Sequence, residues 1–219
     1  MPHRVTIVDY GMGNLLSVAR ALEHCGAEVE LASEPGRVAE AERLVLPGVG
    51  AFPDGMRELR RRSLVEALLT YAASRRPLLG ICLGMHLLME SSEEHGVHEG
   101  LGLVEGGVAA VPRVDAGGNP QKVPIVGWRP LVASNGHGWS DAVLRGIDEG
   151  ESFYFVHSYT ASPSVPGQRV ADIRYGERRV AAVLRAGAIV GTQFHPEKSG
   201  PAGLRLLANF IEGGAASNV

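Results

Sequence analysis

Cysteine, aromatic residues and long apolar runs are all scarce in this sequence. Its two cysteines, Cys25 and Cys82, can form neither a disulfide framework nor a four-cysteine zinc site. The first apolar stretch ends at Asp9, which makes it too short for the core of a signal peptide or for a membrane span. These absences favour a cytoplasmic protein with reduced thiols.

Neither sign of charge dominates. The 21 Lys and Arg residues and 24 Asp and Glu residues leave a net charge of -3, which gives no overall attraction for nucleic acid or an anionic membrane. With 219 residues, 45% of them apolar, the chain can bury a substantial core without disulfides. We expect one domain over residues 1–212 and a flexible tail of small and polar residues at 213–219.

Strands and helices alternate in the first part of the chain. Apolar runs predict buried strands at 5–8, 29–31, 44–46 and 78–81. Apolar residues at helical spacing predict helices at 15–25, 56–69 and 83–89. This alternation predicts an α/β fold whose central, mostly parallel sheet is covered on both faces, giving three layers.

The second half of the chain is richer in strands. Strand patterns occur at 104–111, 152–156, 170–175, 180–185 and 188–194, with few helices between them. A loop is expected at 113–120 and a closing helix at 201–211. We therefore expect an antiparallel or mixed sheet region added to the parallel one.

The most specific local signal is a cysteine between two glycines where a strand meets a helix. Gly80 and Gly84 flank Cys82 at two residues on either side, the spacing of a nucleophile elbow. Such a turn would expose the thiol at the end of the sheet and aim the N–H of Leu83 at an oxyanion. The alternative is a buried structural cysteine in a tight turn. Cys25 lies on the apolar stripe of a helix and is expected to be structural.

A cysteine nucleophile needs a base, and the base needs an orienting group. His195 and Glu197 are two residues apart, so in an extended segment both side chains point to the same side. Glu197 can then bind one ring nitrogen while the other faces the thiol. The alternative is a surface His/Glu pair at a strand end.

The other histidines carry weaker signals. No acidic residue that could orient His157 lies nearby, so we expect a packed or hydrogen-bonded residue at a strand end. His95 and His98 lie in a loop rich in Ser, Glu and Gly, where a solvated loop is favoured over a metal site. The glycine-rich turn at 47–52 can supply a second oxyanion N–H beside a cysteine elbow.

A competing motif suggests nucleotide binding. Gly11 and Gly13 follow the first strand, and Glu30 lies where an acid binds ribose in dinucleotide folds. Leu16 replaces the third glycine of that fingerprint, so nucleotide binding is the minority interpretation.

Taken together, the motifs resemble those of class I, triad-type glutamine amidotransferases. Segments 9–15, 47–52, 154–159 and 193–199 are similar to one group within that family, the glutaminase subunits of imidazole glycerol phosphate synthase. The likeness spans nearly the whole chain. It implies a flavodoxin-like fold, no cofactor and no metal.

The resemblance also implies roles for individual residues. Cys82, His195 and Glu197 would hydrolyse glutamine, with oxyanion stabilisation from Leu83, Val49 and Gly50. Glutamine would be held by Gly48, His86, Ser158 and Tyr159. The partner would be a (β/α)₈-barrel cyclase that uses the ammonia, and the residues that contact it would be Asn14, Trp128 and Lys198. The products of such a heterodimer are imidazole glycerol phosphate and an aminoimidazole carboxamide ribotide.

Two positions depart from the family pattern. His86 stands where the family has a glutamine that contacts substrate. Because imidazole is shorter than that amide and can carry a charge, glutamine affinity is expected to fall or to depend on pH. Arg129 stands where the family has asparagine after the tryptophan. These departures leave two alternatives open: an amidotransferase that feeds another synthase, such as one modifying a polysaccharide sugar, or a non-catalytic scaffold subunit.

Overall fold

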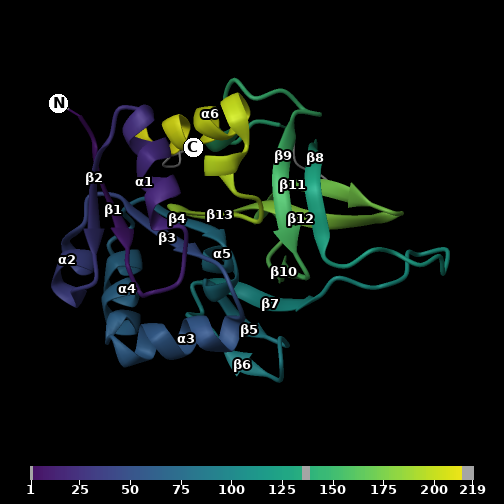
Figure 1. Cartoon of the computed structure of the whole chain (residues 1–219), viewed down its shortest axis with the longest axis horizontal. Helices are drawn as coiled ribbons and strands as arrows, with labels where there is room; N and C mark the ends of the chain where they lie inside the picture. The colour runs from purple at the N-terminus through teal and green to yellow at the C-terminus, as the bar shows by residue number, and fades with distance from the viewer. Residues whose placement is uncertain (1, 135–138, 214–219) are drawn as a thin grey trace.

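The computed structural model describes residues 2–134 and 139–213 (Figure 1). Most of the tail predicted to be flexible, residues 214–219, lies outside the described residues. None of the helices in the described part of the chain is long and apolar enough to cross a membrane.

One nine-stranded sheet runs through the molecule in the order β2-β1-β3-β4-β13-β12-β11-β8-β9. The first five strands in this order pair in parallel: β2 (Glu28–Ala32), β1 (Arg4–Val8), β3 (Leu44–Gly48), β4 (Leu78–Cys82) and β13 (Ile189–Thr192). The rest of the sheet is antiparallel and consists of β12 (Arg178–Ala186), β11 (Arg169–Tyr175), β8 (Ile125–Ala133) and β9 (Ser152–His157). The predicted fold class, a parallel region with an antiparallel addition, is confirmed.

A second sheet of four strands lies against the first. Its order is β10 (Tyr159–Pro163), β7 (Val104–Ala110), β5 (Met89–Ser92) and β6 (His98–Glu99). The chain passes from β9 directly into β10, so residues 157–159 connect the two sheets. This junction becomes one wall of the site described below.

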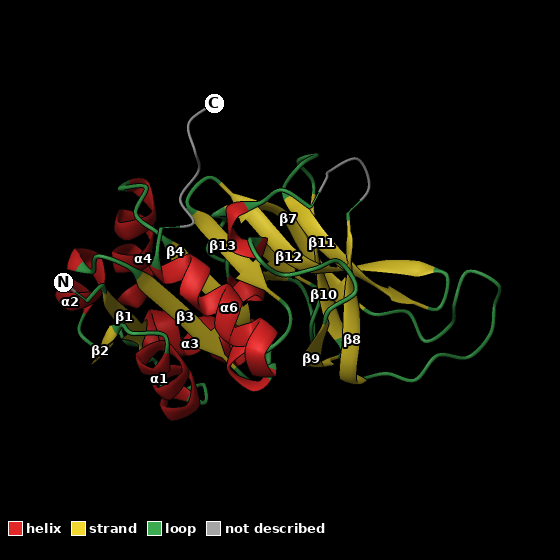
Figure 2. Ribbon diagram, turned by 90° about the horizontal axis from the view of Figure 1, so that it is seen from above, coloured by secondary structure: helices red, strands yellow, loops and turns green. Residues whose placement is uncertain are grey.

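Helices cover both faces of the parallel strands (Figures 1 and 2). Side chains of α1 (Leu15–His24) and α6 (Gly200–Ile211) pack with Val45, Leu79 and Ile81 on one face. The opposite face, which includes Leu44 and Leu46, is covered by α2 (Pro35–Glu40), α3 (Phe52–Arg61), α4 (Leu64–Ala73) and α5 (Leu83–Leu87). Alternate residues of β3 thus enter different cores, as expected for a strand buried on both faces.

Several elements differ from the prediction. The helical pattern at 56–69 is interrupted at Ser63, whose φ of 57° breaks the chain into α3 and α4. The sequence did not predict α2, β5, β6, β8 or β10. Strand β8 contains Gly127 and Pro130, residues that ordinarily argue against a strand, and β5 and β6 are only 4 and 2 residues long.

Candidate active site

The cysteine elbow has the geometry that its glycines predict. Strand β4 is buried throughout and ends on Cys82, whose φ of 54° and ψ of −109° are rarely adopted by a residue with a side chain. A Cβ atom on Gly84 would lie 1.8 Å from the carbonyl oxygen of Leu46, and one on Gly80 would lie 2.9 Å from the backbone nitrogen of Met85. The turn therefore requires glycine on both sides of the cysteine.

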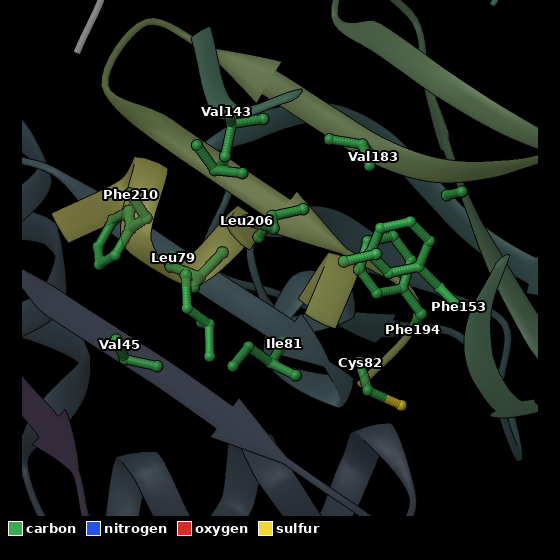
Figure 3. Packing of buried hydrophobic residues seen from close by; sticks show 14 of the residues in the cluster. Val45, Leu79, Ile81, Cys82, Val143, Phe153, Val183, Phe194, Leu206 and Phe210 are labelled. Atoms are coloured by element: carbon green, nitrogen blue, oxygen red, sulfur yellow. The ribbon is translucent and has the colours of Figure 1, made fainter. Parts of the chain in front are cut away.

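Strand pairing brings His195 to this elbow from the other end of the chain. β13 pairs in parallel with β4, with Thr192 opposite Ile81, so the residues after β13 emerge beside Cys82. Phe194 is fully buried against Phe153, with ring centroids 4.3 Å apart, and the N–H of His195 donates to the carbonyl of Tyr154 at 3.0 Å. Figure 3 shows Phe153, Phe194 and Cys82 in this part of the core.

The imidazole of His195 contacts both predicted partners. Its Nδ1 lies 2.9 Å from Oε1 of Glu197, and the ring also forms a hydrogen bond with Cys82. The segment is not extended as predicted, because His195 is followed by a 3-10 turn, η2 (Pro196–Lys198). The turn, and not a two-residue alternation, folds the Glu197 carboxylate back onto the ring.

Charge and burial act in opposite directions on His195. Burial alone would lower its pKa, but the hydrogen bonds and negative charges of Cys82 and Glu197 raise the pKa to about 9. At neutral pH the ring therefore holds a proton beside the thiol. Helix α5, at only five residues, is too short to contribute much dipole, so His195 is the main cationic group acting on the sulfur.

A cavity of about 350 Å³ opens at this pair. Besides Cys82 and His195, it is lined by Val49, Gly50, Leu83, His86, Glu94, Pro124, Val156, His157, Ser158 and Tyr159. A slightly larger hollow of about 400 Å³ lies between β1, β2 and α2, but it contains no nucleophile, and two of its charged residues, Glu30 and Arg37, pair with each other. The smaller cavity is therefore the candidate active site.

The structure brings together most of the residues predicted for the site. Val49, Gly50, Leu83, His86, Ser158 and Tyr159 all line the cavity, whereas Gly48 lies behind it at the end of β3, opposite Cys82. The three residues predicted to meet a partner, Asn14, Trp128 and Lys198, are exposed and lie outside the cavity. The exposed fraction of Trp128 is 54%, a large value for so apolar a side chain.

His86 is buried and neutral. Its Nε2 lies 2.8 Å from Oε1 of Gln193, and burial lowers its pKa to about 4 in spite of that hydrogen bond. The sequence left room for a charged imidazole in the substrate pocket, and burial removes that possibility near pH 7. Arg129, the second departure, lies over the ring of Tyr175, with its guanidinium carbon 5.3 Å from the ring centroid.

Four residues that line the cavity were not predicted as part of the site, namely Glu94, Pro124, Val156 and His157, and two of them, Glu94 and His157, are titratable. Glu94 lines the cavity, and its Oε2 accepts a hydrogen bond from the N–H of Phe52 at 2.8 Å. His157 is the hydrogen-bonded strand-end residue that was expected, with Nδ1 2.8 Å from the carbonyl of Tyr159, but it also lines the cavity. Burial and the neighbouring histidines lower its pKa to about 4. The loop composition around Glu94 gave no signal, because only the fold brings it to the elbow.

The nucleotide-binding alternative loses its acidic residue. The carboxylate of Glu30 pairs with Arg37 and Arg4. The glycine loop instead lies close to the end of β3 and the turn after it: a Cβ atom on Gly50 would lie 2.9 Å from the methyl carbon of Met12, and one on Gly13 would lie 3.6 Å from Cγ of Pro47. Among residues 2–134 and 139–213, no three His, Cys, Asp or Glu side chains are grouped to hold a metal, so His95 and His98 form no such centre there.

Comparison with known proteins identifies the family. The model of class-I glutamine amidotransferases matches residues 6–213. The imidazole glycerol phosphate synthase subunit HisH 1 of Legionella pneumophila (strain Lens) is 47% identical over 209 residues, covering 95% of this chain and 98% of the relative. Subunit HisH of Aromatoleum aromaticum is 49% identical over 212 residues, covering 94% and 97%.

Solved structures share the fold at low sequence identity. A crystal structure of a glutamine amidotransferase has a TM-score of 0.71 at 18% identity and covers 95% of this chain and 97% of that one. The structure of PurLQS from Thermotoga maritima has a TM-score of 0.68 at 16% identity, covering 97% and 99%. The chain therefore belongs to the class-I glutamine amidotransferase family and, within it, to the group of HisH subunits of imidazole glycerol phosphate synthase.

Proposed function

We propose that this chain hydrolyses glutamine to glutamate and ammonia through Cys82, His195 and Glu197. The observation that supports this proposal most directly is that the imidazole of His195 contacts both the Cys82 thiol and the buried Glu197 carboxylate at the wall of a cavity. Glu197 fixes the ring orientation through Nδ1, which leaves Nε2 for the thiol. No cofactor is needed for this chemistry.

The reaction proceeds in two halves. The proton of the Cys82 thiol is held by His195, and the sulfur forms a bond with the carboxamide carbon of glutamine. His195 then gives the proton to the nitrogen as the C–N bond breaks, which releases ammonia and leaves a glutamyl thioester. In the second half His195 takes a proton from water, the hydroxide attacks the thioester carbon, and the C–S bond breaks to give glutamate.

The remaining cavity residues suit the other parts of glutamine. Leu83, Val49 and Gly50 all line the cavity, so the backbone N–H of Leu83, with that of Val49 or Gly50, would stabilise the oxyanion on the attacked carbon. Glu94 offers a carboxylate to the α-ammonium group, and Ser158 and Tyr159 offer polar groups to the α-carboxylate. His86, neutral and paired with Gln193, offers a polar edge in place of the family's glutamine.

The two cysteines provide a matched test of this proposal. Release of ammonia and glutamate from glutamine is measured with the chain in complex with its co-purified synthase partner. Cys82→Ala should lose activity by at least about a thousandfold, while Cys25→Ala should leave it unchanged. Cys25 is only partly buried and its Sγ hydrogen-bonds to the Leu204 carbonyl, away from the cavity. Retained turnover in the Cys82 variant refutes the assignment.

We further propose that residues 1–212 act as a single glutaminase domain of an imidazole glycerol phosphate synthase in histidine biosynthesis. The named relatives support this assignment. Exposed apolar side chains adjoin the cavity: Val49 and Val156 line it, and Val126 and Trp128 lie beside them on β8. This surface, with Asn14 and Lys198, would receive a (β/α)₈-barrel cyclase and pass ammonia to it.

Activity of the complex separates this proposal from its alternatives. Glutamine should support formation of imidazole glycerol phosphate by the chain with the cyclase barrel. Turnover with ammonium salts but never with glutamine would indicate a non-catalytic scaffold. Failure to bind that barrel, with capture of a different synthase, would indicate an amidotransferase for another acceptor.

A further inference from the structure

A buried tyrosine holds the turn that carries the proposed oxyanion donors. Tyr10 follows β1 closely, is fully buried, and packs in the same core as Leu46 and Leu83. Its hydroxyl donates a hydrogen bond of 2.8 Å to the carbonyl oxygen of Pro47. Pro47 lies in β3, directly before the turn Gly48–Gly50.

The hydroxyl also restricts the residue after Pro47. A Cβ atom on Gly48 would lie 2.3 Å from the Tyr10 oxygen and 2.9 Å from Cβ of Leu83. The phenol therefore contacts the peptide between Pro47 and Gly48 at both its carbonyl and the following Cα. Because a peptide unit is planar, holding these two points restricts the orientation of the peptide from which the Gly48–Gly50 backbone departs.

Tyr10 can act on this backbone but not as an acid or base. Burial raises the pKa of its hydroxyl far above the ordinary value, and a negative charge on Cys82 raises it further. The hydroxyl thus stays protonated, and its single hydrogen is given to Pro47. The phenol also lies near the cysteine elbow, because Gly48, which its hydroxyl approaches, pairs with Cys82 across β3 and β4.

We propose that Tyr10 is a positioning residue that fixes the Pro47–Gly48 peptide and thereby aims the backbone N–H groups of Val49 and Gly50 at the oxyanion formed on Cys82. The inference rests on the proposed glutaminase function. It makes Tyr10 necessary for the rate of the chemical step and not for binding of glutamine.

A second tyrosine supplies a matched control. Tyr71 is also fully buried, and its hydroxyl donates to the carbonyl of Pro77 at 2.7 Å, with the carbonyl of Glu42 as a longer second acceptor at 3.3 Å. Pro77 precedes β4, so this bond lies at the end of the strand opposite Cys82. Tyr10→Phe and Tyr71→Phe each remove one buried hydroxyl from one proline carbonyl, but only the first change affects the turn.

The experiment compares both variants with the unmodified chain in complex with its synthase partner. For Tyr10→Phe, kcat for glutamine should fall about tenfold, a fraction of the loss expected when an oxyanion donor is removed outright, with KM unchanged. The rate of Cys82 alkylation by iodoacetamide, which forms no oxyanion, should keep its value and its pH profile. Tyr71→Phe should retain kcat although its unfolding temperature falls to a similar extent.

Each other outcome has a defined meaning. An unchanged kcat in Tyr10→Phe, or equal losses of kcat in both variants, overturns the positioning role. A parallel loss of alkylation rate in Tyr10→Phe also overturns it, because the variant then perturbs the thiol itself. Absence of glutamine hydrolysis in the unmodified complex refutes the proposed function, and the inference falls with it.

Discussion

One methyl group at Gly84 should separate strand β3 from the cysteine elbow. Because a Cβ there would lie 1.8 Å from the Leu46 carbonyl oxygen, Gly84→Ala must displace backbone. We expect it to lower the free energy of unfolding by about 1–3 kcal/mol and to abolish glutamine hydrolysis. The midpoint of urea unfolding measures the first effect and ammonia release the second.

Gly36 serves as the control for this substitution. It lies in α2, and a Cβ on it would meet no atom within 4 Å among the described residues. Gly36→Ala should leave activity intact and stabilise the protein by up to about 1 kcal/mol, since alanine favours helix. Equal unfolding midpoints for the two variants would contradict the steric argument.

For individual residues, spacing in the sequence identified those whose roles depend on residues a few positions away in the chain. The glycines around Cys82 and the pair His195 and Glu197 each form a local pattern, and the structure places them in one site. Glu94 and Tyr10 have no such pattern. Glu94 lies in a loop and Tyr10 follows a strand, and only tertiary folding brings them close to the cysteine elbow. No reading of periodicity can find contacts of that kind.

Strands β11 and β12 are held together by a buried carboxylate. Asp172 on β11 pairs with Arg169 on the same strand at 2.8 Å and with Arg179 on β12 at 3.5 Å. The Asp172 side chain is 2% exposed, but the arginines are about a third exposed, so water can partly solvate them after its removal. Asp172→Ala should lower the free energy of unfolding by about 1.5–3 kcal/mol, the range for hydrogen bonds to charged groups.

The pair of Arg37 and Glu30 offers a comparison at the surface. Both side chains are partly exposed, so Glu30→Ala should change the free energy of unfolding by no more than about 1 kcal/mol. Urea titrations of the two variants test the difference. A loss as small in Asp172→Ala as in Glu30→Ala would show that burial does not strengthen this network.

Helices and strands could be predicted where the apolar pattern of the sequence favoured one type of secondary structure. The strands β1, β3 and β4 are rich in apolar residues because helices cover both their faces, and such segments are easily recognised. Strand β8 could not be predicted, since pairing with β9 and β11 overrides its glycine and proline. The break between α3 and α4 depends on one left-handed residue, Ser63, which the apolar spacing does not register.

For the molecule as a whole, the histidines set the pH at which stability is greatest. The pKa of His195 is raised to about 9, so its contribution is complete below the ordinary value of 6.5 and is lost as pH rises toward 9. His86 and His157 have pKa values lowered to about 4, so the folded state loses stability as pH falls from 6.5 toward 4. The free energy of unfolding should therefore peak near pH 6.5.

Urea titrations across this range, with two variants, test the assignment. Glu197→Gln removes a charge that holds the proton on His195 and should flatten the loss of stability on the alkaline side. His86→Gln removes a titrating group and should flatten the loss on the acid side. A free energy of unfolding that climbs between pH 6.5 and 9 would contradict the raised pKa of His195.

The parallel pairing of β4 with β13 has a consequence for the order of events during synthesis. A growing polypeptide contains Cys82 well before the ribosome has made His195, and β13 must insert between β4 and β12 before the two meet. On the proposed mechanism, a nascent chain that stalls in between has no base for its thiol and hydrolyses no glutamine. The proposed release of ammonia is thereby reserved for chains whose translation has passed the last strand.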